Sequence, residues 1–509
     1  MTITMNDLEN SKQAGTFTIS PGKDIYGELT FSGPNSTLYL RDNEYFDMRA
    51  IPGQCIKGTL HDLTKVTLLH CITKSGTGHA TRGKEKYCFA TIFPHYVLHG
   101  DHQITHDEKT ITEVHFVMDD ASVLFYDFDA FGSLIDARPY IEQIVRANRL
   151  EREIPVGTDP EILYFTGKHE IFSADTVLGR VSASHNPTHT LGGPEGVQLK
   201  NTIVTTIVFK EACTFDETID RTLTLLSYLG VLVGRPQNLL RLNLRVKSDD
   251  DRPGILRVYW SMPPRRNTSD DSQRPHPADI LMDAARQPDA FSRVLKSWLD
   301  RHQDWHDARL RFSNSFEQQK YSTDRLIGSA NMFDILPSSA VPPDVPVSEE
   351  VKSAKTRCSK IFKELPKSPE RDSVLSALGR IGKSTLKNKI RHRGKYLVDT
   401  VGEQFPDLFT VTDEAVNCRN HYVHGSEPIF DYSKESDVVI FFTDTLEFVF
   451  AASDLIESGW DVRAWTKIPT SMSHPFGGYR VSYCDNLRKL QSLVSINSQP
   501  RRKRKIPTR

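Results

Sequence analysis

The sequence lacks an excess of charge of either sign, and it lacks any long hydrophobic run. Across 509 residues, 64 Lys and Arg stand against 65 Asp and Glu, a formal net charge of −1. This balance excludes a globally basic nucleic-acid binder but not a local basic patch. No stretch approaches the ~18 apolar residues of a membrane-spanning helix. The densest run, residues 438–442, is broken by Thr443 and Asp444. We therefore expect no membrane partner.

Paired cysteines and a secretion signal are missing as well. The seven cysteines are scattered without a C-x-x-C pair, which favours reduced thiols over a disulfide framework. The first residues contain neither the basic nor the apolar region of a secretory signal. A cytoplasmic location is therefore expected. The length alone suggests two to four domains, at ~150 residues per domain.

The first half of the chain has the pattern of strands and turns. Short runs of β-branched and aromatic residues alternate with Gly, Pro, Asn and Asp, and two hairpins are predicted across residues 33–36 and 61–65. A helix is predicted near residues 216–233. Further strands are expected at residues 202–209, 240–246 and 255–260. We group residues 15–262 as a β-rich unit, single or divided in two, behind a flexible N-terminus at residues 1–14.

The second half changes to a helical pattern. Residues 263–278 are polar and rich in proline, so a linker is expected there. Apolar residues then recur at helical spacing, first at residues 291–299 and again in an amphipathic segment at residues 436–459. The pattern predicts an α+β protein in which the β-rich domain precedes an all-α bundle at residues 279–465. Residues 466–509 are expected to form a C-terminal extension with a basic tail.

The sharpest motif of the chain is Arg419-Asn420-His421-Tyr422-Val423-His424-Gly425. Thr412 is predicted to cap the N-terminus of a short helix, and Gly425 is predicted to end it. The motif would then occupy the last helical turns. At 100° per residue, Asn420 and His424 lie about 40° apart, and Arg419 lies about 140° from His424. A long arginine side chain can bridge that arc.

A guanidinium, an amide and an imidazole at one helix end suit the phosphodiester of RNA. His424 could take the proton of a ribose 2′-hydroxyl or protonate the leaving 5′-oxygen, because imidazole is present in both states near neutral pH. Arg419 could hold the phosphate and neutralise its developing charge. Asn420 could orient either group, and His421 could assist. This chemistry needs no metal and no cofactor. A second histidine would help acid-base cleavage, so a homodimer is expected.

The pattern Arg419-Asn420-x-x-x-His424 resembles the R-x4-6-H motif of the HEPN superfamily of helical RNases and nucleotide-binding domains. The segment at residues 446–459 is similar to the helix after the motif in the Apea-like branch. Residues 56–60 and 66–69 resemble strands of that branch's β-rich N-terminal domain. The layout of a β-rich domain followed by a HEPN-like bundle is also similar to that of the Apea-like branch.

The resemblance implies a metal-independent endoribonuclease that acts in bacterial anti-phage defence by abortive infection. It assigns catalytic roles to Arg419 and His424, with Asn420 in support. The implied partners are RNA, either tRNA or mRNA, a second copy bound through the helical domain, and a phage-derived trigger sensed by the N-terminal domain. The alternative is a non-catalytic adaptor or regulator that binds RNA or a nucleotide.

Three weaker patterns remain. Residues 377–385 invite comparison with a P-loop, but Ala377 stands where Gly is required and the preceding segment from Pro369 predicts a helix start. Two histidine groups lack the partners of a metal site, and loop positions are expected for them: His99, His102 and His106, then His185 and His189. The basic tail could contact RNA phosphates or remain a solvated tail; its residues are Arg501, Arg502, Lys503, Arg504 and Lys505.

Overall fold

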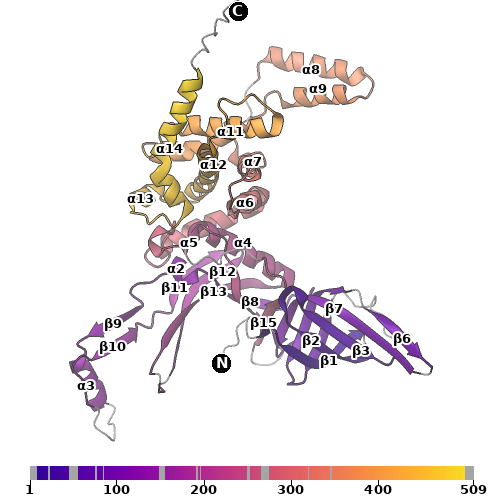
Figure 1. Ribbon diagram of the computed structural model, residues 1–509, viewed down its shortest axis with the longest axis vertical. Coiled ribbons are helices and arrows are strands. Elements are labelled where there is room, and N and C mark those ends of the chain that lie inside the picture. Colours follow the sequence, from indigo (N-terminus) through magenta and orange to yellow (C-terminus); the bar gives the residue numbers. More distant parts are fainter. Residues whose placement is uncertain are drawn as a thin grey trace, which may run out of the picture. The chain divides into compact units, whose positions relative to one another are not determined.

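A computed structural model describes most of the chain (Figure 1). The described residues are 8–20, 23–44, 55–74, 77–83, 85–147, 155–190, 193–194, 196–248, 253–264, 274–318, 320–343 and 347–498. The chain divides into two compact units, Met1–Leu299 and Asp300–Arg509. The first contains the strands and the second is helical, so the predicted α+β class with a β-rich part before a helical part is confirmed.

Six strands of the first unit pair into a closed ring. They are β1 (Lys12–Ser20), β2 (Lys23–Thr30), β3 (Thr37–Asp42), β4 (Ile56–Leu60), β5 (Lys65–Thr73) and β7 (Glu85–Gly100). The antiparallel order is β7-β3-β2-β1-β4-β5, and β5 pairs back with β7. Alternate residues face inward, so side chains such as Phe17, Leu38 and Leu68 form one core. Both predicted hairpins are confirmed, as β2–β3 and β4–β5.

The sheet continues from β7 through six more strands. Their order is β15 (Gly254–Trp260), β14 (Leu239–Val246), β8 (Ile111–Met118), β13 (Leu199–Cys213), β12 (Gly179–His189) and β11 (Glu170–Thr176). The predicted helix is α4 (Phe215–Val233). Its capping box joins Thr214 and Glu217, which satisfies the free N–H groups of the first turn. Because the pairing is continuous, the strands on both sides of β7 belong to one sheet.

Smaller elements complete the first unit. They are β6 (Gly78–Arg82), which pairs with β7, the separate pair β9 (Phe131–Ile135) and β10 (Glu161–Phe165), and the helices α2 (Ala121–Leu124), α3 (Arg138–Ala147), η1 (Gly33–Asn35) and η5 (Pro277–Asp279). Of the N-terminus expected to be flexible, residues 1–7 lie outside the described residues. The rest differs from that expectation, because Leu8 is buried and β1 begins at Lys12.

The helix α5 (Pro288–Asp300) packs with the strands rather than with the helical bundle. Its predicted apolar face is buried. Phe291 contacts the rings of Phe125, Phe172 and Tyr228, and Trp298 also contacts Tyr228. The division of the chain therefore falls after Leu299, downstream of the linker expected at residues 263–278. Of that linker, residues 265–273 lie outside the described residues.

The second unit is built around one central helix, α12 (Ser436–Glu457). Its other helices are α6 (His302–Phe316), α7 (Thr323–Asn331), η6 (Ser338–Ala340), α8 (Glu349–Glu364), α9 (Pro369–Arg380), α10 (Leu386–Val401), α11 (Leu408–His424), α13 (Val462–Lys467) and α14 (Pro475–Ser498). Consecutive residues from Thr445 to Leu455 are all buried. The prediction that this segment is amphipathic is therefore wrong, because neighbouring helices cover α12 on every side.

Two carboxylates of α12 lie inside the bundle and are paired with arginines. Glu447 accepts two hydrogen bonds from Arg325 of α7, at 2.9 and 2.7 Å, and Asp454 accepts two from Arg309 of α6, at 2.9 and 3.0 Å. All four side chains are almost fully buried. Removing one member would leave an unpaired buried charge, so these pairs hold α6 and α7 in a defined register against α12.

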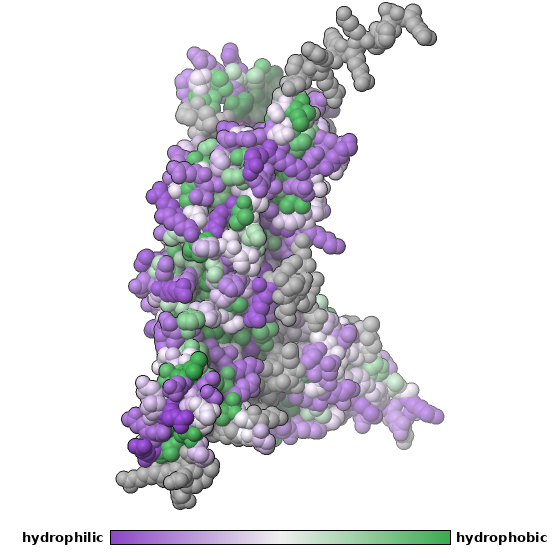
Figure 2. Space-filling view, turned by 60° about the vertical axis from the view of Figure 1, so that its left-hand side comes forward, coloured by the Kyte–Doolittle hydropathy of each residue, from purple (hydrophilic) through white to green (hydrophobic). Residues whose placement is uncertain are grey.

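The last helix belongs to the bundle. Tyr479 of α14 packs against Phe405, Phe441 and Phe448, and Tyr483 donates a hydrogen bond to the Pro406 carbonyl at 2.7 Å. Residues expected to form a separate extension from 466 onward therefore contribute to the core. In the part of the chain that the structure describes, no helix is both long and apolar enough to cross a bilayer. Hydrophilic residues cover most of the surface seen in Figure 2.

Candidate active site

The helix that carries the Arg-Asn-His motif begins earlier than its sequence predicts. α11 starts at Leu408, so the prediction that Thr412 caps it is wrong. Leu408 and Val411 are buried, and their packing extends the helix upstream, while the Thr412 hydroxyl donates to the Phe409 carbonyl. The predicted end is confirmed. Gly425 has a φ of 67°, a left-handed conformation that glycine adopts without strain, and its N–H bonds to the His421 carbonyl.

Arg419 brings the predicted residues together. Its Nη1 donates to the Asn420 side-chain oxygen at 3.0 Å and to His424 Nε2 at 3.2 Å. Since arginine only donates, His424 Nε2 is the acceptor, and the proton of a neutral ring lies on Nδ1. The guanidinium thus spans the arc between residues 419 and 424 that helical geometry predicts. It places a positive charge directly beside an unprotonated imidazole nitrogen.

A residue that sequence reasoning missed anchors the same guanidinium. Arg419 Nη2 donates to the side-chain oxygen of Asn331 at 2.7 Å. Asn331 is the last residue of α7 and lies 88 positions upstream of Arg419. No spacing rule connects the two, because only the packing of α7 beside α11 brings them into contact. The bond fixes one side of the fork and leaves the other toward His424.

The site is open on one side and closed on the other. His424 is exposed, and Arg419 and Asn420 are half-buried. Arg419 Nε is buried and makes no hydrogen bond with any described residue. The preceding Cys418 is fully buried, which raises the pKa of its thiol to about 12 and excludes it as a nucleophile near neutral pH. Solvent therefore reaches this site at His424 and the outer edge of the guanidinium.

The other residues predicted for the site lie apart from it or are not described. His421 Nδ1 donates to the Ser426 carbonyl at 2.8 Å, and its ring packs against Tyr422 and Tyr432. These contacts turn its side chain to the loop after α11 rather than to Arg419. The residues Arg501, Arg502, Lys503, Arg504 and Lys505 lie outside the described residues.

The weaker sequence patterns have structural explanations. Residues 377–385 span the end of α9 and the N-cap of α10, where the Thr385 hydroxyl accepts from the Asn388 N–H. A helix starting at Pro369 precedes them, as predicted, so the strand that a P-loop requires is replaced by α9. The loop expectation is wrong for His99, which lies in β7, and for His185 and His189, which lie in β12. Within the described ranges, no three His, Cys, Asp or Glu residues are placed to hold a metal.

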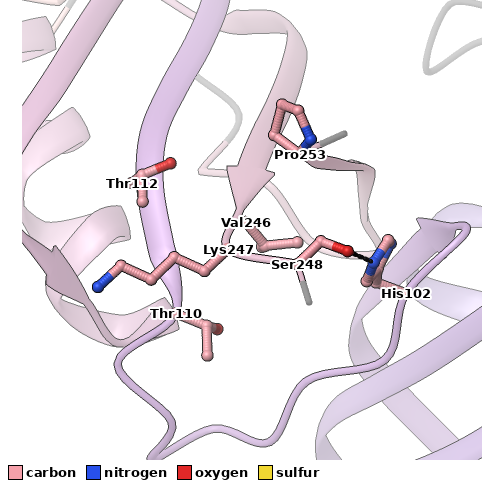
Figure 3. Close-up of a pocket in the computed structure, with 7 residues that line it drawn as sticks. All are labelled: His102, Thr110, Thr112, Val246, Lys247, Ser248 and Pro253. Carbon is pink, nitrogen blue, oxygen red and sulfur yellow. Dashed lines mark hydrogen bonds between the residues drawn. The ribbon is translucent and has the colours of Figure 1, made fainter. Parts of the chain in front are cut away.

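The first unit contains a polar cavity of about 890 Å³, and Figure 3 shows the hydrogen bond between Ser248 and His102 in its lining. His102 Nδ1 donates to Asp101 at 2.8 Å, and Ser248 Oγ lies 2.8 Å from His102 Nε2. Gly254 makes room for the ring, since a Cβ there would lie 2.4 Å from His102 Nδ1. Thr110, Thr112 and Lys247 also line the cavity. Hydroxyls, an imidazole and an ammonium suit a polar or anionic ligand.

Comparison with family models covers both units. The family described as ApeA N-terminal domain 1 matches residues 3–298, and the family described as Apea-like HEPN matches residues 327–463, which include the whole Arg-Asn-His motif. Neither the curated proteins nor the solved structures contain a match to this chain. HEPN domains are generally ribonuclease domains, which suggests a ribonuclease-type or defence function. The chain belongs to the Apea-like HEPN family with an ApeA N-terminal domain 1.

Proposed function

We propose that this protein is a metal-independent endoribonuclease that cleaves RNA by transesterification at the ribose 2′-hydroxyl. The observation that carries the proposal is the contact between Arg419 and His424 at an exposed helix end, with Asn331 and Asn420 holding the guanidinium. A phosphodiester needs a positive charge beside its non-bridging oxygens and a proton acceptor beside the 2′-hydroxyl. These two groups stand next to each other here.

The geometry suggests how substrate would start the reaction. A bound phosphate would accept hydrogen bonds from the outer Nη1 of Arg419, which now donates to His424. The released Nε2 would then take the proton of the 2′-hydroxyl, whose oxygen attacks phosphorus as the bond to the 5′-oxygen breaks. A second imidazole would protonate that leaving oxygen. In our proposal the second imidazole comes from His424 of another copy in a homodimer formed through the helical unit.

In the biological proposal, the enzyme serves anti-phage defence by abortive infection and cuts tRNA or mRNA once infection is sensed. The first unit would act as the sensor. Its polar cavity beside His102 and Ser248 supports this role, because it offers donors and a positive charge to a small phage-derived or infection-induced ligand. Binding of that ligand would raise the rate of RNA cleavage above its basal level.

The test uses the full-length protein with a mixed pool of tRNA and mRNA in excess EDTA. Wild type should produce cuts that end in a 2′,3′-cyclic phosphate. Arg419→Ala and His424→Ala should each lower the cleavage rate by a factor of about 100 or more, because each removes a group that acts in the transition state. His421→Ala is the matched control, since it alters a histidine of the same helix that points elsewhere. It should retain cleavage.

The alternative is a non-catalytic adaptor that binds RNA or a nucleotide. It rests on the single motif of each chain, which supplies one imidazole where two are needed. RNA binding without cleavage, in wild type isolated both before and during infection, would favour this alternative. Equal cleavage by wild type and by the folded double variant Arg419→Ala/His424→Ala would contradict the assigned site.

A further inference from the structure

The helical unit carries a basic hairpin that adds nothing to its core. α8 and α9 pair as two antiparallel helices, which stand out from the rest of the helical unit in Figure 1. Neither helix contains a buried residue. Their own contacts hold them together: Arg371 Nε donates to the Phe362 carbonyl at 2.8 Å, and Lys355 Nζ donates to the Ile381 carbonyl at 3.1 Å. A folded element that stabilises no core is available for an interaction outside the bundle.

α8 carries its basic residues in the middle of the helix and three acidic residues, Glu349, Glu350 and Glu364, at its ends. Between Val351 and Lys363 there are five basic residues and no acidic one. Three of the five, Lys352, Lys360 and Lys363, lie within an arc of about 80° on the helix, and all three are exposed. The half-buried side chains of Cys358 and Phe362 lie on another face. α8 therefore presents a stripe of ammonium groups to solvent.

Most of these cations have no counter-ion among the residues that the structure describes. Lys352 pairs with Glu349 at the start of the helix. Arg357, Lys360, Lys363 and the loop residue Lys367 form no ion pair with any residue of the described ranges, and all four are exposed. Like charges held at this density repel one another, at a cost to the free protein. A polyanion would relieve that repulsion, because each bound phosphate replaces counter-ions from solution.

The base of the hairpin is tied to the chain beside the candidate active site. Asp334 lies three residues after Asn331, which holds Arg419. Lys389, in the first turn of α10, the helix that follows the hairpin, donates from Nζ to the Asp334 carbonyl at 2.9 Å. This bond closes the base of the segment between α7 and α10. The hairpin thus projects from the same part of the bundle that positions the guanidinium.

We propose that the α8–α9 hairpin is an arm that binds the phosphate backbone of the RNA and directs it to Arg419 and His424. The inference rests on the proposed ribonuclease function and adds the surface that captures the substrate. Such an arm would bind through charge, so it would select RNA by its backbone rather than by its bases. Its contribution should appear in affinity and in salt dependence, and the chemical step should be unaffected.

The test compares two triple variants of the full-length protein. The arm variant is Lys360→Gln/Lys363→Gln/Lys367→Gln. The control is Lys86→Gln/Lys210→Gln/Lys467→Gln, which removes the same charge at three exposed lysines outside the arm. Both also carry His424→Ala, so that binding is measured without cleavage. The probe is a fluorescent single-stranded polyuridine of about 20 nucleotides, titrated at several salt concentrations.

The arm variant should bind about tenfold more weakly near 0.1 M salt, and its plot of log affinity against log salt should be less steep by about 2, because three phosphate contacts are lost. The control should match the His424→Ala protein. With His424 restored, the arm variant should raise KM and leave kcat unchanged. Equal salt slopes for the arm variant and the control variant would contradict the proposal that the hairpin binds RNA. The absence of RNA binding by the His424→Ala protein would contradict it as well. Arm-dependent binding without cleavage would support the arm and refute the nuclease.

Discussion

At the scale of residues, the site depends on which hydrogen-bond acceptors the two terminal nitrogens of the Arg419 guanidinium contact. Nη2 donates a hydrogen bond to Asn331, and Nη1 donates to Asn420 and His424. A guanidinium held on one side loses little freedom when a phosphate binds on the other, and its charge is always present. Asn331 is thus a positioning residue, which acts through Arg419 without touching the substrate in our proposal.

Replacing Asn331 should slow cleavage without unfolding the protein. Asn331→Ala removes a hydrogen bond to a charged group, worth roughly 1.5–3 kcal/mol, so kcat should fall about tenfold to a hundredfold. The measurement is steady-state cleavage together with thermal unfolding. Asn314→Ala, an exposed asparagine of α6, is the control and should leave both unchanged.

A conservative variant separates positioning from a merely structural role. Asn331→Asp keeps the acceptor oxygen but adds a negative charge beside Arg419, which should compete with the phosphate. It should therefore raise KM more than it lowers kcat. An equal loss of kcat in the Ala and Asp variants, with an equal loss of thermal stability, would contradict the positioning role.

At the scale of elements, α12 combines an apolar core helix with ionisable groups. Besides Glu447 and Asp454 it carries Asp444, whose carboxylate accepts a hydrogen bond from the Tyr321 hydroxyl at 2.6 Å. The pKa of Asp444 is raised to about 7, chiefly by burial and also by the nearby Glu447, against the opposing effects of the Tyr321 hydrogen bond and of Arg325. The helix therefore contains an acid that gains a proton near neutral pH.

This shift has a defined effect on stability. The pKa of Asp444 in the folded protein lies above the unfolded value of ~3.9, so the folded state binds more protons between those two values. The contribution of Asp444 to the free energy of unfolding is therefore complete below pH ~4 and is lost as the pH rises to ~7. Asp444→Asn imitates the protonated acid, so the variant should keep this contribution to stability as the pH rises.

Between pH 5 and pH 8, the free energy of unfolding of wild type should fall by about 2 kcal/mol relative to that of Asp444→Asn. Urea unfolding at a series of pH values measures this difference. Asp437→Asn, an exposed aspartate of the same helix, controls for the loss of one negative charge. Parallel pH profiles for Asp444→Asn and wild type would show that Asp444 remains ionised in the folded protein.

At the scale of the whole molecule, the division after Leu299 predicts which fragment folds alone. A fragment of residues 279–509 would carry α5 without its partners and expose Phe291, Leu295 and Trp298, which are buried in the first unit. A fragment of residues 300–509 omits that helix. We expect the shorter fragment to be monodisperse and the longer one to aggregate, since exposed apolar patches drive association.

Gel filtration and binding of a hydrophobic dye check this expectation. Triple substitution of Phe291, Leu295 and Trp298 by Ser should make the longer fragment monodisperse, because it removes the exposed apolar face that drives aggregation. Aggregation of the shorter fragment alone would mean that α5 is required by the helical unit, and the boundary would have to be placed before residue 279.

Features that depend on neighbours in the chain were predictable from sequence. The hairpins β2–β3 and β4–β5 are set by turn residues between alternating strands. The spacing of Arg419, Asn420 and His424 follows from 3.6 residues per turn, and Gly425 ends the helix because it adopts a positive φ without strain. The apolar face of α5 could also be identified, although not the unit against which it packs.

The sequence by itself determined the α+β layout, the local hairpins and the helical site motif, because each is governed by interactions over a few residues. Tertiary structure alone decided that β5 closes the ring with β7, that α12 is covered on every side, and that Asn331 holds Arg419. These contacts join residues far apart in the chain. Their free energy comes from burial and from satisfying buried polar groups, which no local pattern encodes.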